Sequence, residues 1–234
     1  GGVAMAPHEA NALPLTEALP PVLTSEQRIA WLRLIRSENV GPVTFRELVN
    51  QFGGATEALA ALPSLSRRGG RRASLRICRR DEAEAEIDAV DRLGARLIAI
   101  GEAGYPPWLA RIEAPPPLLC IKGQSGLVSR PIISIVGSRN ASAAGQKIAR
   151  TLAADLGKHG FVIASGLARG IDAAAHRAAI DTGTIAVLAG GVDIIYPPEH
   201  AQLHRQIAEQ ALLICERPPG LDPRAQDFPR RNRL

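Results

Sequence analysis

The chain has 234 residues, of which 46% are hydrophobic and 22% are charged, as in ordinary globular proteins. Lys and Arg exceed Asp and Glu by 28 to 23, and the formal charge of +5 is compatible with an anionic partner without identifying one. No apolar run approaches the ~20 residues of a membrane-spanning helix, and the start lacks a signal-peptide pattern, so we expect a cytoplasmic protein without a membrane partner.

The cysteine pattern points the same way. Cys78, Cys120 and Cys215 are far apart, and no CxxC pair or His/Cys cluster has zinc spacing. An odd, scattered set is typical of thiols in a reducing compartment. We expect no metal site.

The first part of the chain predicts a tail and a small helical domain. Residues 1–24 are rich in Ala and Pro without a sustained period, which favours a flexible tail. Thr24 or Ser25 is expected to cap the first helix. "NVGPVTFRELVNQFGG" predicts a turn, a second helix and a glycine stop, and "ATEALAALPSLSRRGG" predicts a third helix. The predicted helical domain covers residues 25–80.

Two features of this domain are open to a second interpretation. The turn "NVGPVT" resembles the hairpin of helix-hairpin-helix modules, which hold DNA backbones with loop amides, although a plain helix–turn–helix packing unit explains it more simply. A basic run follows, typical of a solvated linker and alternatively part of a phosphate-binding surface. Its members are Arg67, Arg68, Arg71, Arg72, Arg76, Arg79 and Arg80.

From residue 81 onward the pattern alternates between helices and strands. An acidic helix is predicted over 81–94, with strands at 95–100 and 117–123. Beyond Pro131 we expect strands at 132–137, 161–166, 184–191 and 211–216, separated by helices at 142–160, 171–183 and 198–210. Nearly continuous apolar strands between amphipathic helices indicate an α/β fold: a Rossmann-like, doubly wound, mainly parallel sheet over residues 81–234. In the 142–160 helix, Ile148, Leu152 and Leu156 share one apolar face.

Three loops end at the carboxyl edge of this sheet, where ligands bind in such folds. They are "GSRNAS" (137–142), "SGLARG" (165–170) and "AGGVDIIYPPE" (189–199). Each contains glycines that let a backbone approach an anion closely, and the first two precede helix N-termini. The glycines concerned are Gly137, Gly166, Gly170, Gly190 and Gly191.

Arg139 and Arg169 lie on the first two loops and are expected to converge on phosphate oxygens. Ser138 fills the place where a dinucleotide fingerprint has its second glycine. Ser142 is expected to cap the following helix, with a hydroxyl contact to the anion as the alternative.

Asp172 and His176 share a helix face, but no nucleophile stands at a partner spacing. We therefore expect them to shape the pocket, with acid–base catalysis as the minor alternative. Asp193 is expected to shape the pocket wall. GxGxxG and Walker A motifs are absent, so we expect no nicotinamide cofactor and no ATP turnover. Aromatic residues make up 3% of the chain, with few near the loops, so phosphate contacts should dominate any binding of single strands.

Taken in order, "SIVGSRNAS", "IASGLARGIDAAAH", "TIAVLAGGVDIIYPPEH" and "FPRRNR" resemble the DNA-processing protein A family (DprA, also called Smf). The resemblance covers residues 25–234. It implies a non-enzymatic protein of natural transformation that binds single-stranded DNA, protects it and helps to load the recombinase RecA, as a homodimer and without a cofactor. Arg139 and Arg169 fall on arginine or lysine positions of the family's DNA pocket.

The resemblance also implies that "FPRRNR" borders that pocket, through Arg230, Arg231, Asn232 and Arg233. Family members continue beyond this motif, so the Rossmann-like domain is expected to be incomplete at Leu234. The main alternative is a nucleotide-metabolising enzyme of the nucleoside monophosphate hydrolase type. Such enzymes have a PGGxGT loop, which the segment "LAGGVD" of this chain resembles in part. A protein-interaction scaffold is the third possibility.

Overall fold

The computed structural model describes residues 22–68 and 75–234, and the predicted tail falls mostly outside this range. Helices come first: α1 (Ser25–Arg36), α2 (Pro42–Phe52), α3 (Ala55–Arg68) and α4 (Arg80–Arg92). The strands are β1 (Arg96–Ala99), β2 (Leu118–Gly123), β3 (Ile132–Ser134), β4 (Val162–Ser165), β5 (Thr184–Val187) and β6 (Leu212–Cys215). Between and after them lie α5 (Ala143–Lys158), α6 (Ile171–Ala179), α7 (Ala201–Gln210), α8 (Asp227–Arg231) and the 3₁₀ turns η1 (Leu109–Arg111), η2 (Ser125–Ser129) and η3 (Pro198–His200).

The first three helices form as the sequence predicts. Thr24 and Gln27 make a reciprocal capping box at the start of α1, where Thr24 Oγ1 accepts from the Gln27 amide at 3.2 Å. Gly53 ends α2 in the left-handed conformation, with φ 82°. Leu34, Phe45 and neighbouring apolar side chains from α2 and α3 form a separate small core.

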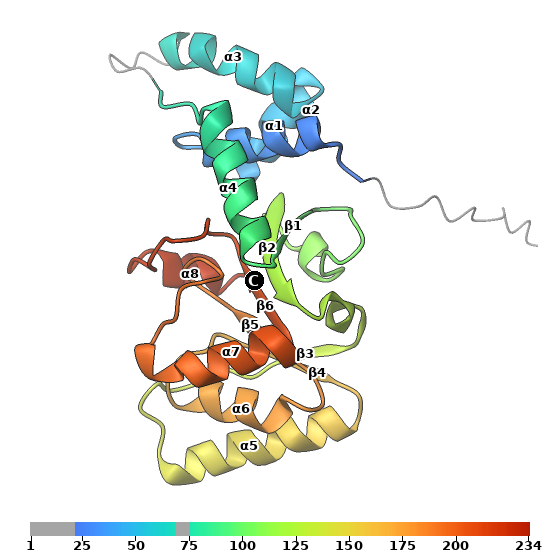
Figure 1. Ribbon diagram of the computed structural model, residues 1–234, viewed down its shortest axis with the longest axis vertical. Coiled ribbons are helices and arrows are strands. Elements are labelled where there is room, and N and C mark those ends of the chain that lie inside the picture. Colours follow the sequence, from blue (N-terminus) through green and yellow to red (C-terminus); the bar gives the residue numbers. More distant parts are fainter. Residues whose placement is uncertain (1–21, 69–74) are drawn as a thin grey trace, which may run out of the picture.

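The sheet is mixed, in the order β1-β2-β6-β5-β4-β3 (Figure 1). Strands β3 to β6 are parallel and follow one another across the sheet in chain order, with α5 beside α6. Strands β1 and β2 extend it in antiparallel fashion. The Rossmann-like α/β fold is therefore confirmed, with two antiparallel strands added at one edge.

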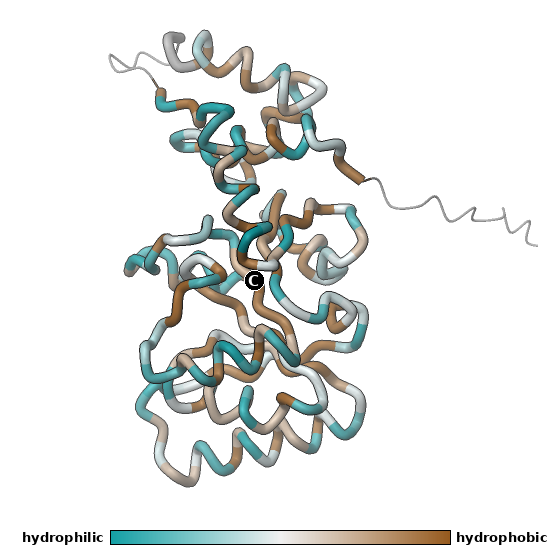
Figure 2. Tube along the Cα trace, viewed as in Figure 1, coloured by the Kyte–Doolittle hydropathy of each residue, from teal (hydrophilic) through white to brown (hydrophobic). Residues whose placement is uncertain are grey.

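Burial follows this layout. Every residue of β5 and β6 is buried, as expected of parallel strands covered on both faces, and Figure 2 shows apolar residues concentrated along the strands. Cys120 on β2 stands directly opposite Cys215 on β6. Both are buried and free, as is Cys78.

The predicted apolar face of α5 is wrong for Ile148 and Leu152, whereas Leu156 is partly buried and packs against a core cluster. Ile148 is 68% exposed and Leu152 is 48% exposed, whereas Ala149, Ala153 and Gly157 are buried. Small residues permit the close packing of α5 on α6: a Cβ at Gly157 would lie 2.2 Å from Thr182 Oγ1, beyond the end of α6. The approach of two helices thus overrides hydrophobic periodicity here.

Ion pairs join the helical part to the sheet. Arg28 of α1 pairs with Glu102 at 2.6 Å and donates to the Leu97 carbonyl at 2.8 Å. Arg36 pairs with Glu86 of α4 and donates to the Glu216 carbonyl at 3.0 Å. Because α4 packs on both α1 and β1, the domain boundary expected between residues 80 and 81 stays a prediction.

Part of the predicted basic run is engaged in ion pairs. Arg76 pairs with Glu82 at 2.7 Å, Arg79 pairs with Asp81, and Arg80 pairs with Glu26 and Glu84. Residues 69–74, with Arg71 and Arg72, lie outside the described residues. Within the described ranges, no helix is long and apolar enough to cross a membrane, and no three His, Cys, Asp or Glu residues cluster as a metal site.

Candidate functional site

The three predicted loops lie side by side, because β3, β4 and β5 are neighbours in the sheet and run parallel. They surround a small pocket of about 50 Å³. A cavity that holds one water has a volume of about 10–15 Å³, so a pocket several times larger has room for a group the size of a phosphate. Among its lining residues are Arg139, Gly166, Arg169, Gly190, Tyr196, Phe228 and Arg231.

Glycines bring the first and second loops into backbone contact. Gly170 has φ 72°, and a Cβ there would lie 2.2 Å from the Ser138 carbonyl oxygen. The Ile171 amide donates to that same carbonyl at 3.2 Å. At Gly137 a Cβ would lie 2.6 Å from Ile171 Cγ1. Only glycine permits this approach at both positions, which places Arg139 and Arg169 on adjoining segments.

Side chains from beneath hold the second loop in a strained shape. Leu167 is fully buried at φ 55°, a conformation rare for a residue with a branched side chain. His200 Nδ1 lies 3.0 Å from the Leu167 carbonyl. Asp172 Oδ2 accepts from the amides of Gly166 at 3.1 Å and Ala168 at 3.3 Å. Asp172 therefore shapes the loop that carries Arg169.

Arg231 of α8 braces the pocket from the side. Its Nη1 donates to the carbonyls of Gly166 at 2.7 Å and Val187 at 3.0 Å, joining the second loop to the end of β5. Burial lowers the pKa of Arg231, with Asp172 opposing this shift and Arg139 adding to it. A Cβ at Gly166 would lie 2.1 Å from Nη1, so glycine makes room for the guanidinium.

Two aromatic rings lie at the pocket, Tyr196 from the third loop and Phe228 from α8. The Arg139 guanidinium carbon lies 5.0 Å from the centre of the Phe228 ring, which contacts Tyr196 at 5.5 Å between ring centres. The ring face attracts the cation and restricts it. Phe228 was missed because it lies some 90 residues beyond Arg139 in the chain, and the only sequence signal for it was the "FPRRNR" motif.

Arg169 has a partner that the sequence did not predict. Its Nε donates to Glu199 Oε1 in an ion pair between exposed side chains, 61% and 47% accessible. The hydrogen bond from Arg169 is the main cause that lowers the pKa of Glu199 to about 2. The guanidinium of Arg169, which is predicted to bind an anion, is therefore paired with the carboxylate of Glu199.

The remaining predicted residues are more dispersed. Ser142 caps α5 by accepting from the Gly145 amide at 3.1 Å, and Ser138 accepts from the Asn140 amide. Asp193 accepts from the Gly220 amide at 3.0 Å, which anchors the third loop. Asn232 accepts from Arg231 Nε at 3.1 Å.

Gly191 and Arg233 lie beside neighbouring segments. Gly191 donates to the Leu221 carbonyl at 3.0 Å. Arg233 donates to the Ala114 carbonyl at 2.7 Å and pairs with Glu216. Arg230 is exposed and has no hydrogen-bond or ion-pair partner among residues 22–68 and 75–234. The pocket therefore collects Arg139, Arg169 and Arg231, but not Arg230 or Arg233.

His176 lies beneath the site. It is fully buried, and its Nδ1 is 2.7 Å from Thr184 Oγ1. Burial lowers the pKa of His176 to about 3, so its imidazole is neutral at neutral pH. Asp172 is bound to loop amides instead. Asp172 thus supports the loop, and His176 joins α6 to β5 through Thr184.

Comparison with known proteins places this chain in a family. The family model described as "DNA recombination-mediator protein A" matches residues 96–234, and that of the "DprA-like N-terminal HHH domain" matches residues 25–89. These matches define a two-part protein, in which a DprA-like N-terminal HHH domain precedes the part of the chain that forms the Rossmann-like sheet. The chain belongs to the DNA recombination-mediator protein A family.

Curated relatives carry the names DprA and Smf. The DNA processing protein DprA of Bacillus subtilis is 42% identical over 144 residues, which is 60% of this chain and 48% of that protein. Protein Smf of Synechocystis is 32% identical over 226 residues, 91% of this chain and 56% of the relative. The chain thus spans about half the length of these relatives.

Solved structures show the same fold. DNA processing protein A of Streptococcus pneumoniae aligns with a TM-score of 0.61 at 28% identity, covering 84% of this chain and 74% of that one. The protein from Helicobacter pylori, whose structure describes a single-stranded DNA binding mode, aligns with a TM-score of 0.55 at 28% identity over 59% and 62% of the two chains.

Proposed function

We propose that this protein binds single-stranded DNA by its phosphates, in the pocket between the first and second loops. The observation that carries the proposal is the placement of Arg139 and Arg169 on adjoining glycine-containing loops at the carboxyl edge of the sheet. Guanidinium groups bind phosphate oxygens with charge-assisted hydrogen bonds. Family membership supports DNA as the source of the phosphates, and the Helicobacter pylori relative supports a single strand.

The proposed activity is binding without turnover. Asp172 is engaged by loop amides and His176 is a buried neutral imidazole, so neither stands as a general acid or base toward the pocket. By family resemblance, the protein would act in natural transformation as a homodimer that protects the strand and helps to load RecA. This wider role rests on family membership alone.

The test is fluorescence anisotropy with labelled poly-dT against unlabelled single-stranded and duplex competitors. We expect preference for the single strand. A plot of the logarithm of the binding constant against the logarithm of the salt concentration should fall with a slope of about −0.7 per phosphate contacted. Equal competition by duplex, or binding insensitive to salt, would contradict the proposal. Turnover of nucleoside monophosphates that is lost in Arg169→Ala would favour the enzyme alternative.

A further inference from the structure

Two of the three cysteines face each other where the antiparallel and parallel parts of the sheet meet. Strand β2 pairs with β6, and this ladder is the junction between the antiparallel strands β1 and β2 and the parallel strands β3 to β6 (Figure 1). Cys120 and Cys215 are the residue pair at one end of the ladder. Both are buried and free. The junction therefore ends in two adjacent thiols.

The geometry of this pair suits a disulfide bond. Residues directly opposite each other in an antiparallel ladder have Cα atoms about 4.5 or 5.5 Å apart. Both separations lie within the range of about 4.4–6.8 Å that a disulfide spans. The two thiols are already in contact, because a hydrogen bond between them is the largest of the causes that raise the pKa of Cys215. A bond between the two sulfur atoms therefore needs little movement of the strands.

A cation lies beside one of these thiols. The positive charge of Arg36 lowers the pKa of Cys215, and so opposes the increase that the hydrogen bond with Cys120 and burial cause. Arg36 is held in place by Glu86 at 2.7 Å and by the carbonyl of Glu216 at 3.0 Å. The thiolate is the reactive form of cysteine, and a neighbouring cation stabilises it. We therefore expect Cys215 to react before Cys120.

A small oxidant has a route to this end of the ladder. A cleft of about 800 Å³ lies between the helical part and the sheet, and its lining includes Arg36, Glu216 and Arg217. Cys215 comes just before two of these residues, and its thiol donates to the Arg217 carbonyl at 3.5 Å. Because the pair Cys120–Cys215 is the last of the ladder, local opening at that end exposes both thiols while the rest of the junction stays paired.

We propose that Cys120 and Cys215 form a redox-active dithiol, which hydrogen peroxide converts into a disulfide that ties β2 to β6. The Cys215 sulfur attacks one peroxide oxygen, the O–O bond breaks, and the leaving hydroxide takes up the thiol proton to form water. The Cys120 sulfur then attacks the sulfenic acid on Cys215, the S–O bond breaks, and a second water leaves with the Cys120 proton. The two sulfur atoms lose two electrons, which the peroxide accepts.

The disulfide should make the protein more stable, and a thiol reductant should reverse it by exchange. Cys120 and Cys215 are far apart in the sequence, so a bond between them strongly restricts the unfolded chain. We expect the oxidised protein to unfold at a Tm about 5–10 °C higher than the reduced protein. The inference does not depend on the proposed binding of DNA.

The test treats the full chain with a small excess of hydrogen peroxide, which catalase then removes. Remaining thiols are alkylated in guanidinium chloride, and mass spectrometry maps the peptides. We expect one pair of peptides joined through Cys120 and Cys215, alkylated Cys78, and separation of the joined pair by dithiothreitol. A disulfide that includes Cys78, or oxidation that leaves Cys120 and Cys215 unlinked, would overturn the inference. An unchanged Tm after complete linkage would contradict the stabilising role.

Three variants assign the roles of the thiols. Cys78→Ala should form the disulfide as the parent does, because Cys78 lies before α4 and outside the sheet. Cys120→Ala should accumulate a sulfenic acid on Cys215, which dimedone traps, because the second thiol is missing. Cys215→Ala should give neither a disulfide nor a trapped adduct on Cys120. Equal trapping in the last two variants would overturn the order of reaction. Circular dichroism confirms folding, and the peptide map of the parent decides the linkage by itself.

Discussion

Arg169 of the second loop, which lines the pocket, forms an ion pair with Glu199 of the third loop. The carboxylate of Glu199 binds the guanidinium of Arg169, which is the group that a phosphate would bind. Since exposed ion pairs are weak, an incoming polyanion can displace the carboxylate, but the negative charge then stays beside it. Binding of a phosphate to Arg169 therefore requires that the ion pair with Glu199 is broken.

We expect Glu199→Gln to strengthen binding of poly-dT by about threefold at low salt, because it removes a competitor and a repulsive charge. Glu209→Gln, which removes an exposed charge from α7, should have no effect. Anisotropy titration measures both. Weaker binding by Glu199→Gln would mean that Glu199 positions Arg169 for DNA instead of competing with it.

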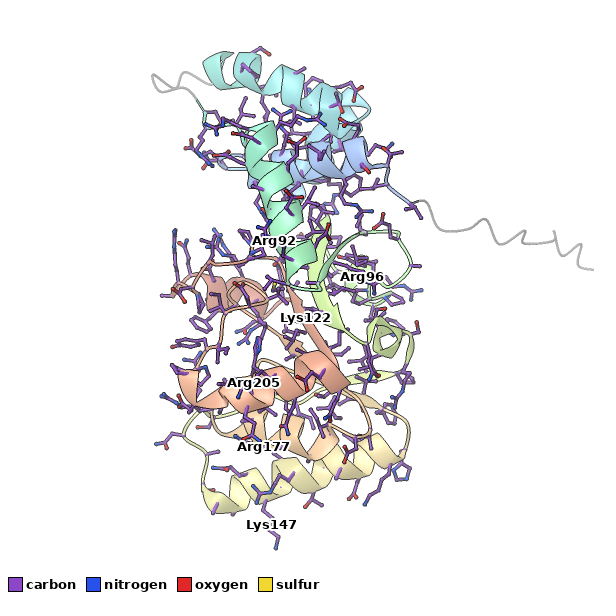
Figure 3. All side chains as sticks on the ribbon, in the orientation of Figure 1. Arg92, Arg96, Lys122, Lys147, Arg177 and Arg205 are labelled. Atoms are coloured by element: carbon purple, nitrogen blue, oxygen red, sulfur yellow. The ribbon has the colours of Figure 1, made fainter. Side chains whose placement is uncertain are left out.

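Arg139→Ala and Arg169→Ala should each weaken binding about tenfold or more, because each removes a charge-assisted contact to phosphate. Arg205→Ala on α7 is the control, since Figure 3 places Arg205 on a helix and it does not line the pocket. All three should fold, because these side chains are exposed. If Arg205→Ala lost as much affinity as Arg169→Ala, the binding surface would lie elsewhere.

The neighbours Arg230 and Arg231 should separate binding from stability. Arg231→Ala leaves the carbonyls of Gly166 and Val187 without their donor, at a cost of about 1–3 kcal/mol, which lowers Tm by about 2–4 °C per kcal/mol. Arg230→Ala should leave Tm unchanged and weaken binding of poly-dT, because Arg230 is an exposed cation beside Arg231 that makes no hydrogen bond or ion pair within residues 22–68 and 75–234. Thermal unfolding and anisotropy read the two effects. Equal Tm values for Arg230→Ala and Arg231→Ala would contradict a stabilising role of the hydrogen bonds that Arg231 donates.

Gly170→Ala should destabilise the protein by about 1–3 kcal/mol, since φ 72° is unfavourable for alanine and its Cβ would lie 2.2 Å from the Ser138 carbonyl. Gly145→Ala in the first turn of α5 meets nothing closer than 3.5 Å and should be neutral or stabilising by up to about 1 kcal/mol. Urea denaturation compares them. A neutral Gly170→Ala would show that the two loops are not in close contact.

His176 should make stability fall with acid. Burial lowers the pKa of His176 from 6.5 to about 3, so the unfolded chain takes up a proton that the folded chain does not. Its contribution to stability is full above pH 6.5 and is lost as pH falls from 6.5 toward 3. An NMR titration should show no protonation of His176 above pH 4 in the folded protein and a midpoint near 6.5 in urea. Titration near 6.5 in the folded state would contradict its buried environment.

Sequence reasoning predicted helices α1 to α7, the strands and the three loops, because glycines, caps and apolar runs act locally, but it did not predict α8. It failed where contacts between segments distant in the chain determine which side chains are buried or come together. Periodicity placed Ile148 and Leu152 on a buried face, but the approach of α5 to α6 selects Ala149 and Ala153 instead. Tertiary packing brings Phe228 to Arg139 and Glu199 to Arg169, and residue spacing provides no signal for these two contacts.

The brace from Arg231 has a consequence for folding. Gly166 and Arg231 are 65 positions apart, so the loop gains this contact only after a long segment has closed. During synthesis the chain emerges from its N-terminal end, and β4 with its loop appears well before α8. The pocket therefore reaches its final shape only after α8 has been made, later than the loops that carry Arg139 and Arg169.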